Sequence, residues 1–185
     1  MRNVFIVLSI LLIPLTGVAQ KGDSTERFEI TPDGFTEHVI REYPGKTDSE
    51  LYNGVLRWAA YTIANDESAR KSDVKDQYLV YRTFVPQGIS LENKGETLTW
   101  DVLFDVAFRF QNQKIRYDIT IVEISSPKAP TFAYKGGPMQ WSFFDENGNP
   151  KENTRKAREQ INNIANDFIR GVSAYINSPR NEDSH

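Results

Sequence analysis

The sequence predicts an α+β fold in which two helices pack on one face of an antiparallel sheet of four to five strands. Apolar and more polar residues alternate over residues 98–110 and again over residues 115–121, and successive side chains of a strand point to opposite faces. Apolar residues at helical spacing follow Thr47 and again follow Pro150. The resulting order of strand, helix, three or four strands and long helix is typical of a sheet that is covered on one face.

The two alternating segments are predicted to form a hairpin with its turn at Asn112-Gln113. In this register four successive cross-strand pairs are apolar on both sides: Phe110 with Ile115, Phe108 with Tyr117, Val106 with Ile119, and Phe104 with Ile121. A slip by one residue would move each of these side chains to the wrong face of the sheet, so the pattern itself favours this register.

Three further strand segments are expected. Residues 28–43 contain a first strand region, which the turn signal Pro32-Asp33-Gly34 interrupts. Residues 73–85 are rich in Tyr, Val and Phe, and Pro86-Gln87-Gly88 closes this strand. Residues 139–144 are expected to form a short edge strand.

The first helix is predicted to begin at Thr47, whose side chain caps it, and Glu50 completes a capping box. Asn65-Asp66 is expected to end this helix. Its apolar face is formed by Leu51, Val55, Trp58, Ala59, Thr62 and Ile63.

The second helix is predicted to have Asn149 as its N-cap, Pro150 at its first position and Glu152 at the capping-box position. Pro179 is expected to stop it. Its apolar stripe consists of Ile161, Ile164, Ala165, Phe168, Val172, Tyr175 and Ile176. A helix of this length can cover the apolar face of the sheet from end to end.

Residues 1–20 have the pattern of an export signal. Arg2 supplies a positive start, and the apolar run over residues 4–15 is shorter than the roughly 20 residues that a spanning helix needs. Gly17-Val18-Ala19 offers the small residues that signal peptidase requires. We therefore expect an exported protein of the periplasm or the extracellular space, with no stable membrane span after cleavage.

The rest of the chain is expected to hold a flexible lead-in over residues 21–27, one α+β domain over residues 28–178 and a polar tail over residues 179–185. The chain has no cysteine, so the domain must be stabilised by its core alone and can form no thiolate metal site. The formal net charge of -3 falls by one more when Arg2 is removed. An acidic balance of this kind argues against nucleic acid as a partner.

Catalytic signatures are missing from the sequence. The two histidines, His38 and His185, cannot build a three-histidine metal site. No serine lies in a nucleophile-elbow motif, and no glycine-rich loop has the spacing that cradles phosphate. We therefore expect no catalytic residues, no metal and no cofactor, and a protein that is not an enzyme.

Four charged residues share the predicted polar face of the hairpin: Asp105, Arg109, Arg116 and Asp118. The register places Arg109 opposite Arg116, with Asp118 diagonal to both Arg109 and Asp105. These residues can form a mixed-charge solvated surface, or the two arginines can grip an anionic ligand. Alternatively, Asp105 and Asp118 form an acid–base pair, since a diagonal Cα separation of about 7–8 Å approaches the roughly 6.5–9.5 Å between the carboxyl groups of inverting glycosidases.

A second candidate is the connection over residues 125–149, which is longer than usual in a compact domain. It contains five aromatic residues: Phe132, Tyr134, Trp141, Phe143 and Phe144. Exposed rings of this kind are good anchors for glycans, peptides or proteins, and Tyr134 and Trp141 are the proposed contacts. The alternative is that these rings pack under the long helix or over an open end of the sheet.

Several short motifs resemble a known family. They are Asp33-Gly34-Phe35 at the first strand, Leu51-Tyr52 with Trp58 in the first helix, and the hairpin return Lys114-Ile115-Arg116-Tyr117. These residues are similar to a domain of unknown function, with a TATA-binding-protein-like fold, found in exported proteins of Gram-negative bacteria. The resemblance covers residues 28–124. It implies a fold and an envelope location, but no activity and no functional residues, and the fold name does not imply DNA binding.

The function that these observations favour is a non-catalytic, exported binding or interaction module of the cell envelope. Its partner would be an envelope protein, a peptide or a glycan. Two alternatives remain: a small hydrolase that uses Asp105 and Asp118, and a structural subunit of an envelope assembly.

Overall fold

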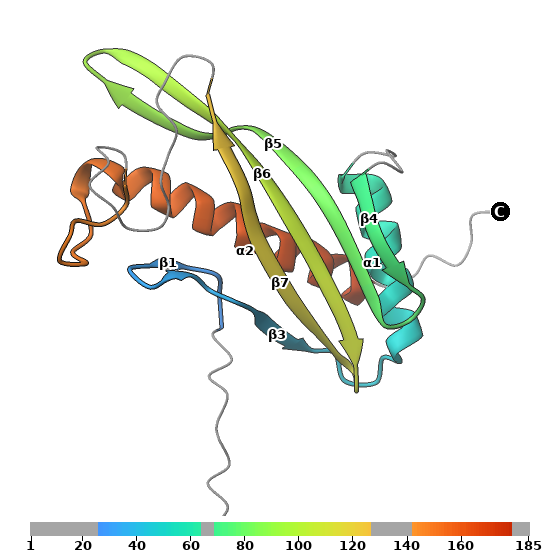
Figure 1. Ribbon diagram of the computed structural model, residues 1–185. Coiled ribbons are helices and arrows are strands. Elements are labelled where there is room, and N and C mark those ends of the chain that lie inside the picture. Colours follow the sequence, from blue (N-terminus) through green and yellow to red (C-terminus); the bar gives the residue numbers. More distant parts are fainter. Residues whose placement is uncertain (1–25, 64–68, 127–141, 179–185) are drawn as a thin grey trace, which may run out of the picture.

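The computed structural model describes residues 26–63, 69–126 and 142–178. Its elements follow the chain in this order: β1 (Ile30–Thr31), β2 (Gly34–Phe35), β3 (Val39–Glu42), α1 (Asp48–Thr62), β4 (Arg70–Val74), β5 (Tyr78–Asn93), β6 (Glu96–Gln111), β7 (Lys114–Ser125), the short 3-10 helix η2 (Glu152–Thr154) and α2 (Arg155–Asn177). Five strands form an antiparallel sheet in the order β3-β7-β6-β5-β4, and β1 and β2 form a separate small hairpin. Both helices lie on one side of the sheet (Figure 1), so the predicted fold class is confirmed.

The hairpin of β6 and β7 has the predicted register, including all four apolar pairs from Phe110 with Ile115 to Phe104 with Ile121. Its turn residues Asn112 and Gln113 both have positive φ, of 55° and 63°. Positive φ at both central residues is the requirement of a two-residue type I′ turn, whose twist matches that of the flanking strands. The carboxylate of Asp48, in the first turn of α1, accepts hydrogen bonds from both turn amides.

Helix α1 begins as predicted. The Thr47 hydroxyl accepts a hydrogen bond from the Glu50 amide at 3.2 Å, and a Glu50 carboxylate oxygen accepts one from the Thr47 amide at 2.8 Å. The helix ends at Thr62. Thr62 is exposed, so the prediction that it belongs to the apolar face is wrong. The proposed end at Asn65-Asp66 lies outside the described residues. The buried face comprises Leu51, Tyr52, Gly54, Val55, Trp58 and Ala59.

The region between α1 and β6 differs from the prediction. The predicted strand over residues 73–85 is two strands, because a turn after Val74 separates β4 from β5. Pro86-Gln87-Gly88 does not close β5; it forms a bulge between Val85 and Ile89, and the strand continues to Asn93. Gln87 has a φ of 51°, and its amide donates to the Asp101 carboxylate at 2.8 Å. A bulge accommodates proline because it interrupts the hydrogen-bond ladder.

The start of the long helix is also corrected. Asn149, Pro150 and Glu152 do not form its first turn, because the chain here pairs with the segment before it: Phe144 forms a bridge with Pro150, and the Lys151 amide donates to the Phe143 carbonyl at 3.0 Å. Helix α2 therefore begins at Arg155. Of the strand expected over residues 139–144, the described part from Ser142 to Phe144 contributes only that bridge. Helix α2 ends at Asn177, and Pro179 lies outside the described residues.

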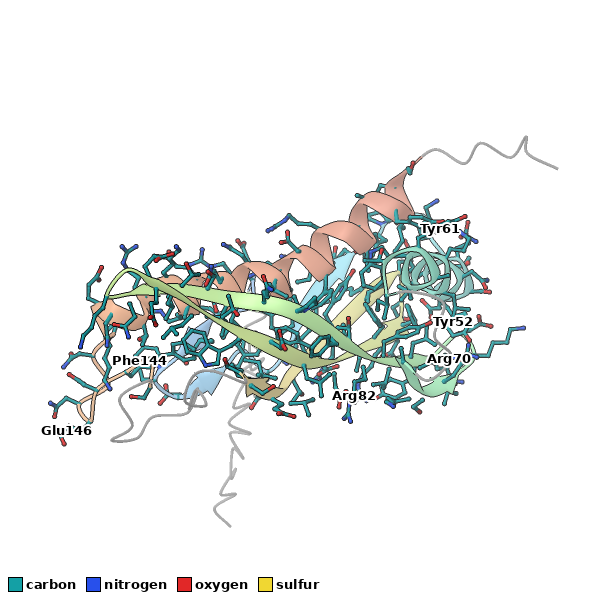
Figure 2. The ribbon with its side chains drawn as sticks, turned by 90° about the horizontal axis from the view of Figure 1, so that it is seen from above. Tyr52, Tyr61, Arg70, Arg82, Phe144 and Glu146 are labelled. Atoms are coloured by element: carbon teal, nitrogen blue, oxygen red, sulfur yellow. The ribbon has the colours of Figure 1, made fainter. Side chains whose placement is uncertain are left out.

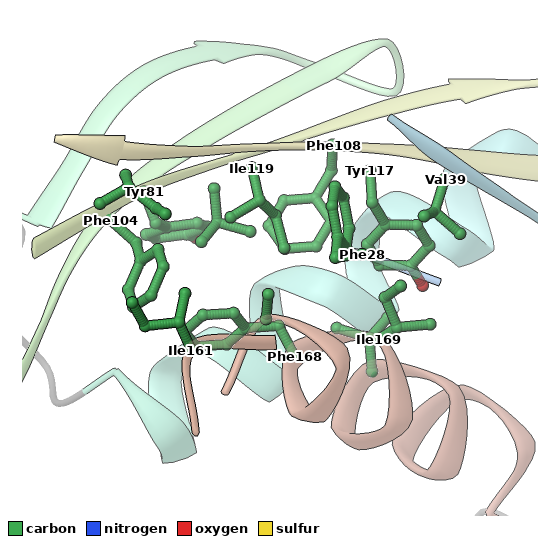
Figure 3. Close-up of a cluster of buried hydrophobic side chains, with 14 of the residues drawn as sticks. Phe28, Val39, Tyr81, Phe104, Phe108, Tyr117, Ile119, Ile161, Phe168 and Ile169 are labelled. Carbon is green, nitrogen blue, oxygen red and sulfur yellow. The ribbon is translucent and has the colours of Figure 1, made fainter. Parts of the chain in front are cut away.

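The core lies between the sheet and the two helices. The Trp58 ring of α1 contacts Phe108 of β6 and Phe168 of α2 in edge-to-face geometry, with centroids 5.9 and 6.3 Å apart. Figure 3 shows the rings of Phe108 and Tyr117 on the sheet above Phe168 and Ile169 on α2. One large apolar face of the sheet is thereby buried, and no helix within the described residues covers the other face.

Candidate interaction surface

The charged residues singled out in the sequence lie on the face of the sheet that points away from both helices. Figure 2 shows Arg82 on this side and Tyr61 on the helix side. The strand register arranges the outward residues in rows that cross β5, β6 and β7. One row holds Tyr78, Arg109 and Arg116, and the next holds Val80, Ala107 and Asp118.

Asp105 is held by a residue that the sequence analysis did not select. Arg82 lies directly opposite it on β5, and its Nε and Nη2 atoms each donate to one carboxylate oxygen of Asp105 at 2.7 Å. Two parallel bonds of this kind fix both side chains in one geometry. The neighbouring Asp105 raises the pKa of Arg82 through the same hydrogen bonds and its charge.

Asp118 is held by two arginines. Arg116 donates to one carboxylate oxygen through Nε and Nη2, at 2.8 and 2.6 Å. Arg109 donates to the other through Nε at 3.3 Å, and its guanidinium lies 5.1 Å from the centroid of the Tyr78 ring. Arg109 and Arg116 are directly opposite each other, as the predicted register requires. Asp118 therefore supplies a counter-charge shared by two arginines that the sheet brings together.

These contacts bear on the three interpretations of the charged residues. Asp105 and Asp118 belong to separate groups of ion pairs, and each carboxylate is already bonded to guanidinium groups. An acid–base pair needs two carboxyl groups that face one substrate site, so the arrangement gives the hydrolase alternative no support. It has the features of a mixed-charge surface whose members pair with one another.

An apolar row crosses the same face one step further along the strands. Phe84 on β5 lies opposite Leu103 on β6. On β7 the register partner of Leu103 is the exposed Glu123, and Val122 is the extra residue of the bulge beside it. The exposed fraction is 57% for Phe84 and 40% for Val122. Sequence reasoning missed this row, although the alternation of β5 places Phe84 on the outward face together with Arg82.

The aromatic connection is described only in part. Tyr134, Trp141 and Phe132 lie outside the described residues. Phe143 and Phe144 are buried, at 0% and 4% exposure, and the Arg158 guanidinium covers the Phe144 ring at 5.3 Å from its centroid. For these two rings the packing alternative is therefore correct.

Among the grooves formed by described residues, two join segments that are distant in the chain. One of about 730 Å³ lies between residues 26–29 and α2. The Asn166 side chain of α2 holds this segment through two hydrogen bonds. It accepts one from the Phe28 amide at 2.9 Å and donates one to the Phe28 carbonyl at 2.8 Å. The other groove, of about 340 Å³, lies between residues 35–37 and β7. Neither groove has a signal in the sequence, because each joins segments that are far apart in the chain.

Within the described residues, no cluster of three or more His, Asp or Glu side chains could hold a metal ion. The described helices also include none that is both long and apolar enough to cross a membrane.

The elements define an α+β domain, in which a five-stranded antiparallel sheet carries two helices on one face and charged residues on the other. The chain is similar to the crystal structure of a DUF4468 family protein from Bacteroides ovatus, with a TM-score of 0.59 and 10% sequence identity over 88% of this chain and 99% of that one. It is also similar to a TBP-like protein from Parabacteroides distasonis, with a TM-score of 0.49 and 14% identity over 77% of this chain and 92% of that one. No family model and no curated protein matches the sequence. The resemblance to a domain of unknown function is thus confirmed in the fold.

Proposed function

We propose that this chain is an exported, non-catalytic binding module of the cell envelope, and that it contacts a protein partner through the open face of its sheet. The apolar row of Phe84, Leu103 and Val122 is the observation that carries this proposal. Apolar side chains framed by polar ones on an otherwise solvated face are typical of protein contact sites. The export and the envelope location rest on residues 1–20.

The charged residues beside the row support a role in recognition. Arg82 with Asp105, and Arg109 with Arg116 and Asp118, are fixed by mutual hydrogen bonds before any partner arrives. A rigid polar rim loses little conformational entropy on binding. The exposed Phe84 ring would supply the anchor, since large side chains at the centre of an interface contribute most of the affinity.

The test is to immobilise the chain and to measure which envelope proteins it retains from a detergent extract. Phe84→Asp is expected to reduce retention of the specific partner about tenfold or more, because it places a charge in the apolar row. Tyr61→Asp is the matched control, since Tyr61 is an aromatic residue with 81% exposure on the helix side. Equal retention by both variants and the unaltered chain would contradict the proposal.

A further inference from the structure

The β7 edge of the sheet is only partly covered. Strand β3 pairs with β7 from Lys114 to Tyr117, whereas β7 continues to Ser125. Figure 1 shows β7 extending well past β3. Among the described residues, no strand pairs with this edge of β7 beyond Tyr117.

The register shows which backbone groups face that edge. In an antiparallel ladder, the N–H and C=O groups of successive residues point to alternate sides. Gln111 and Lys114 close the two-residue turn and bond to each other, so Lys114 faces β6. On the other side, the Tyr43 amide donates to the Gln113 carbonyl at 2.7 Å. Odd-numbered residues of β7, up to its bulge at Val122, therefore face away from β6.

Two residues past the end of β3 have this outward orientation, Ile119 and Ile121. Each presents one N–H and one C=O on the uncovered side, and no described residue forms a hydrogen bond with these groups. Both residues are only 3% exposed. The low value reflects their side chains, which belong to the core. Backbone N–H and C=O groups without a protein partner favour a hydrogen-bonding ligand.

The 340 Å³ groove lies directly along this edge. Residues 35–37 form its far wall, and residues 118–121 of β7 are among those that form the near wall. Its volume falls in the range of ordinary ligand sites, about 300–1,000 Å³. The groove therefore gives access to the edge where Ile119 and Ile121 lack partners.

We propose that this edge binds an extended peptide segment of a partner protein, which adds as a further strand beside β7. Two N–H and C=O pairs, spaced two residues apart, match the repeat of an extended chain. The exposed Glu37 on the far wall forms no ion pair with any described residue, so the segment should carry a lysine or arginine there. A second copy of this chain fits less well. If the β7 edges of two copies paired symmetrically, residues 35–37 of one copy would meet residues 35–37 of the other.

This inference goes beyond the proposed function, because the edge uses backbone groups of β7 and not the apolar row, although Arg116 and Asp118 of the open face also line the groove. Phe84→Asp should leave peptide binding at the edge unchanged. Glu37→Lys should leave retention of the open-face partner unchanged. The failure of one proposal is therefore distinguishable from the failure of the other.

The test starts from eight-residue peptides selected from a random display library against the chain. Selected peptides should slow amide hydrogen exchange at Ile119 and Ile121, with little change at Ile115 and Tyr117, which β3 already covers. Synthetic versions of each peptide should carry N-methyl groups either at its odd or at its even positions. One of these two sets should abolish binding and the other should leave it intact, because an added strand uses the N–H groups of only one side.

Variants of the wall provide the second measurement. Glu37→Lys should weaken the selected peptides about tenfold and Glu37→Gln less, whereas Glu96→Lys, an exposed glutamate at the far end of β6, should have no effect. The proposal is overturned if the library yields no binder, or if the peptides still bind with N-methyl groups at the odd positions and also with N-methyl groups at the even positions. It is also overturned if the free chain forms dimers that protect Ile119 and Ile121.

Discussion

Arg82 and Asp105 lie directly opposite each other on β5 and β6, and their side chains form two parallel hydrogen bonds of 2.7 Å each. Further along the same face, Asp118 joins Arg109 and Arg116. The selected charges of the open face are therefore engaged with one another, whereas the apolar row beside them is exposed at Phe84 and Val122. This contrast is the basis for assigning the apolar row, rather than the carboxylates, as the centre of the surface.

The two aspartates should differ in their contribution to stability. Asp118→Asn leaves Arg109 and Arg116 opposite each other without a counter-charge, and like charges in a cross-strand pair are destabilising. We expect it to lower the free energy of unfolding by about 1 kcal/mol at low salt, and Asp105→Asn to cost less. Urea unfolding measures both. The difference should shrink at about 0.5 M salt, and an Asp118→Asn variant as stable as the unaltered chain would contradict this account.

The close approach of the two helices depends on Gly171. A Cβ atom at this position would lie 2.8 Å from Nε1 of Trp58, whose ring is held between Phe108 and Phe168. Gly171→Ala should therefore destabilise the chain by about 1–2 kcal/mol, although alanine is otherwise the better helix former. Asn163→Ala, at an exposed position of α2, should be neutral or slightly stabilising in the same unfolding experiment. A more stable Gly171→Ala variant would show that the helices are not packed this closely.

Two predicted helix caps can be compared directly. Thr47→Ala removes a hydrogen bond to the Glu50 amide and should cost about 1 kcal/mol. Asn149→Ala removes only an exposed contact with the Asp145 carboxylate and should change stability by less than about 0.5 kcal/mol. Chemical denaturation of both variants tests the start of each helix. Equal costs would place the start of α2 at Pro150, against the structure.

Tyr52 should make stability depend on alkaline pH. Burial, with a smaller contribution from its hydrogen bond to Asp73, raises the pKa of Tyr52 from 10.0 to about 12. The unfolded chain thus loses this proton at a lower pH than the folded chain, so the free energy of unfolding falls as pH rises from 10 toward 12. Tyr52→Phe should make the decline shallower. Burial also raises the pKa of Tyr117, so part of the decline should persist.

The exposed Tyr61 supplies the control for this pH dependence. Tyr61→Phe removes a hydroxyl from a ring that is 81% exposed, so it measures the effect of losing a tyrosine hydroxyl outside the core. A slope that is the same in Tyr52→Phe and in the unaltered chain would rule out Tyr52 as a source.

The elements that could be predicted are those with a local periodic signal. Alternation over β6 and β7 determines their register, because a slip would bury Asp105 or Asp118. Strand β4 was not predicted as a separate strand, because all five of its residues are exposed and it has no apolar alternation. Helix α2 starts later than predicted because Pro150 pairs with Phe144, a contact that a capping motif does not encode.

The candidate surface was predictable only within one hairpin. Arg109, Arg116 and Asp118 meet through the register of β6 with β7, which the sequence specifies strongly. Arg82 reaches Asp105 from a third strand, whose pairing depends on the turn before Tyr78 and on the bulge after Val85. The unpaired groups of Ile119 and Ile121 depend on where β3 ends, which no residue pattern indicates.

Site-specific photo-crosslinking in intact cells tests the central claim most directly. A photoreactive phenylalanine analogue replaces Phe84 in one strain and Tyr61 in another, and crosslinked products are separated by size. We predict a discrete adduct from position 84 that Val122→Asp removes, and no such adduct from position 61. The absence of an adduct at position 84, or the same adduct at both positions, would contradict the assignment of the open face as the binding surface.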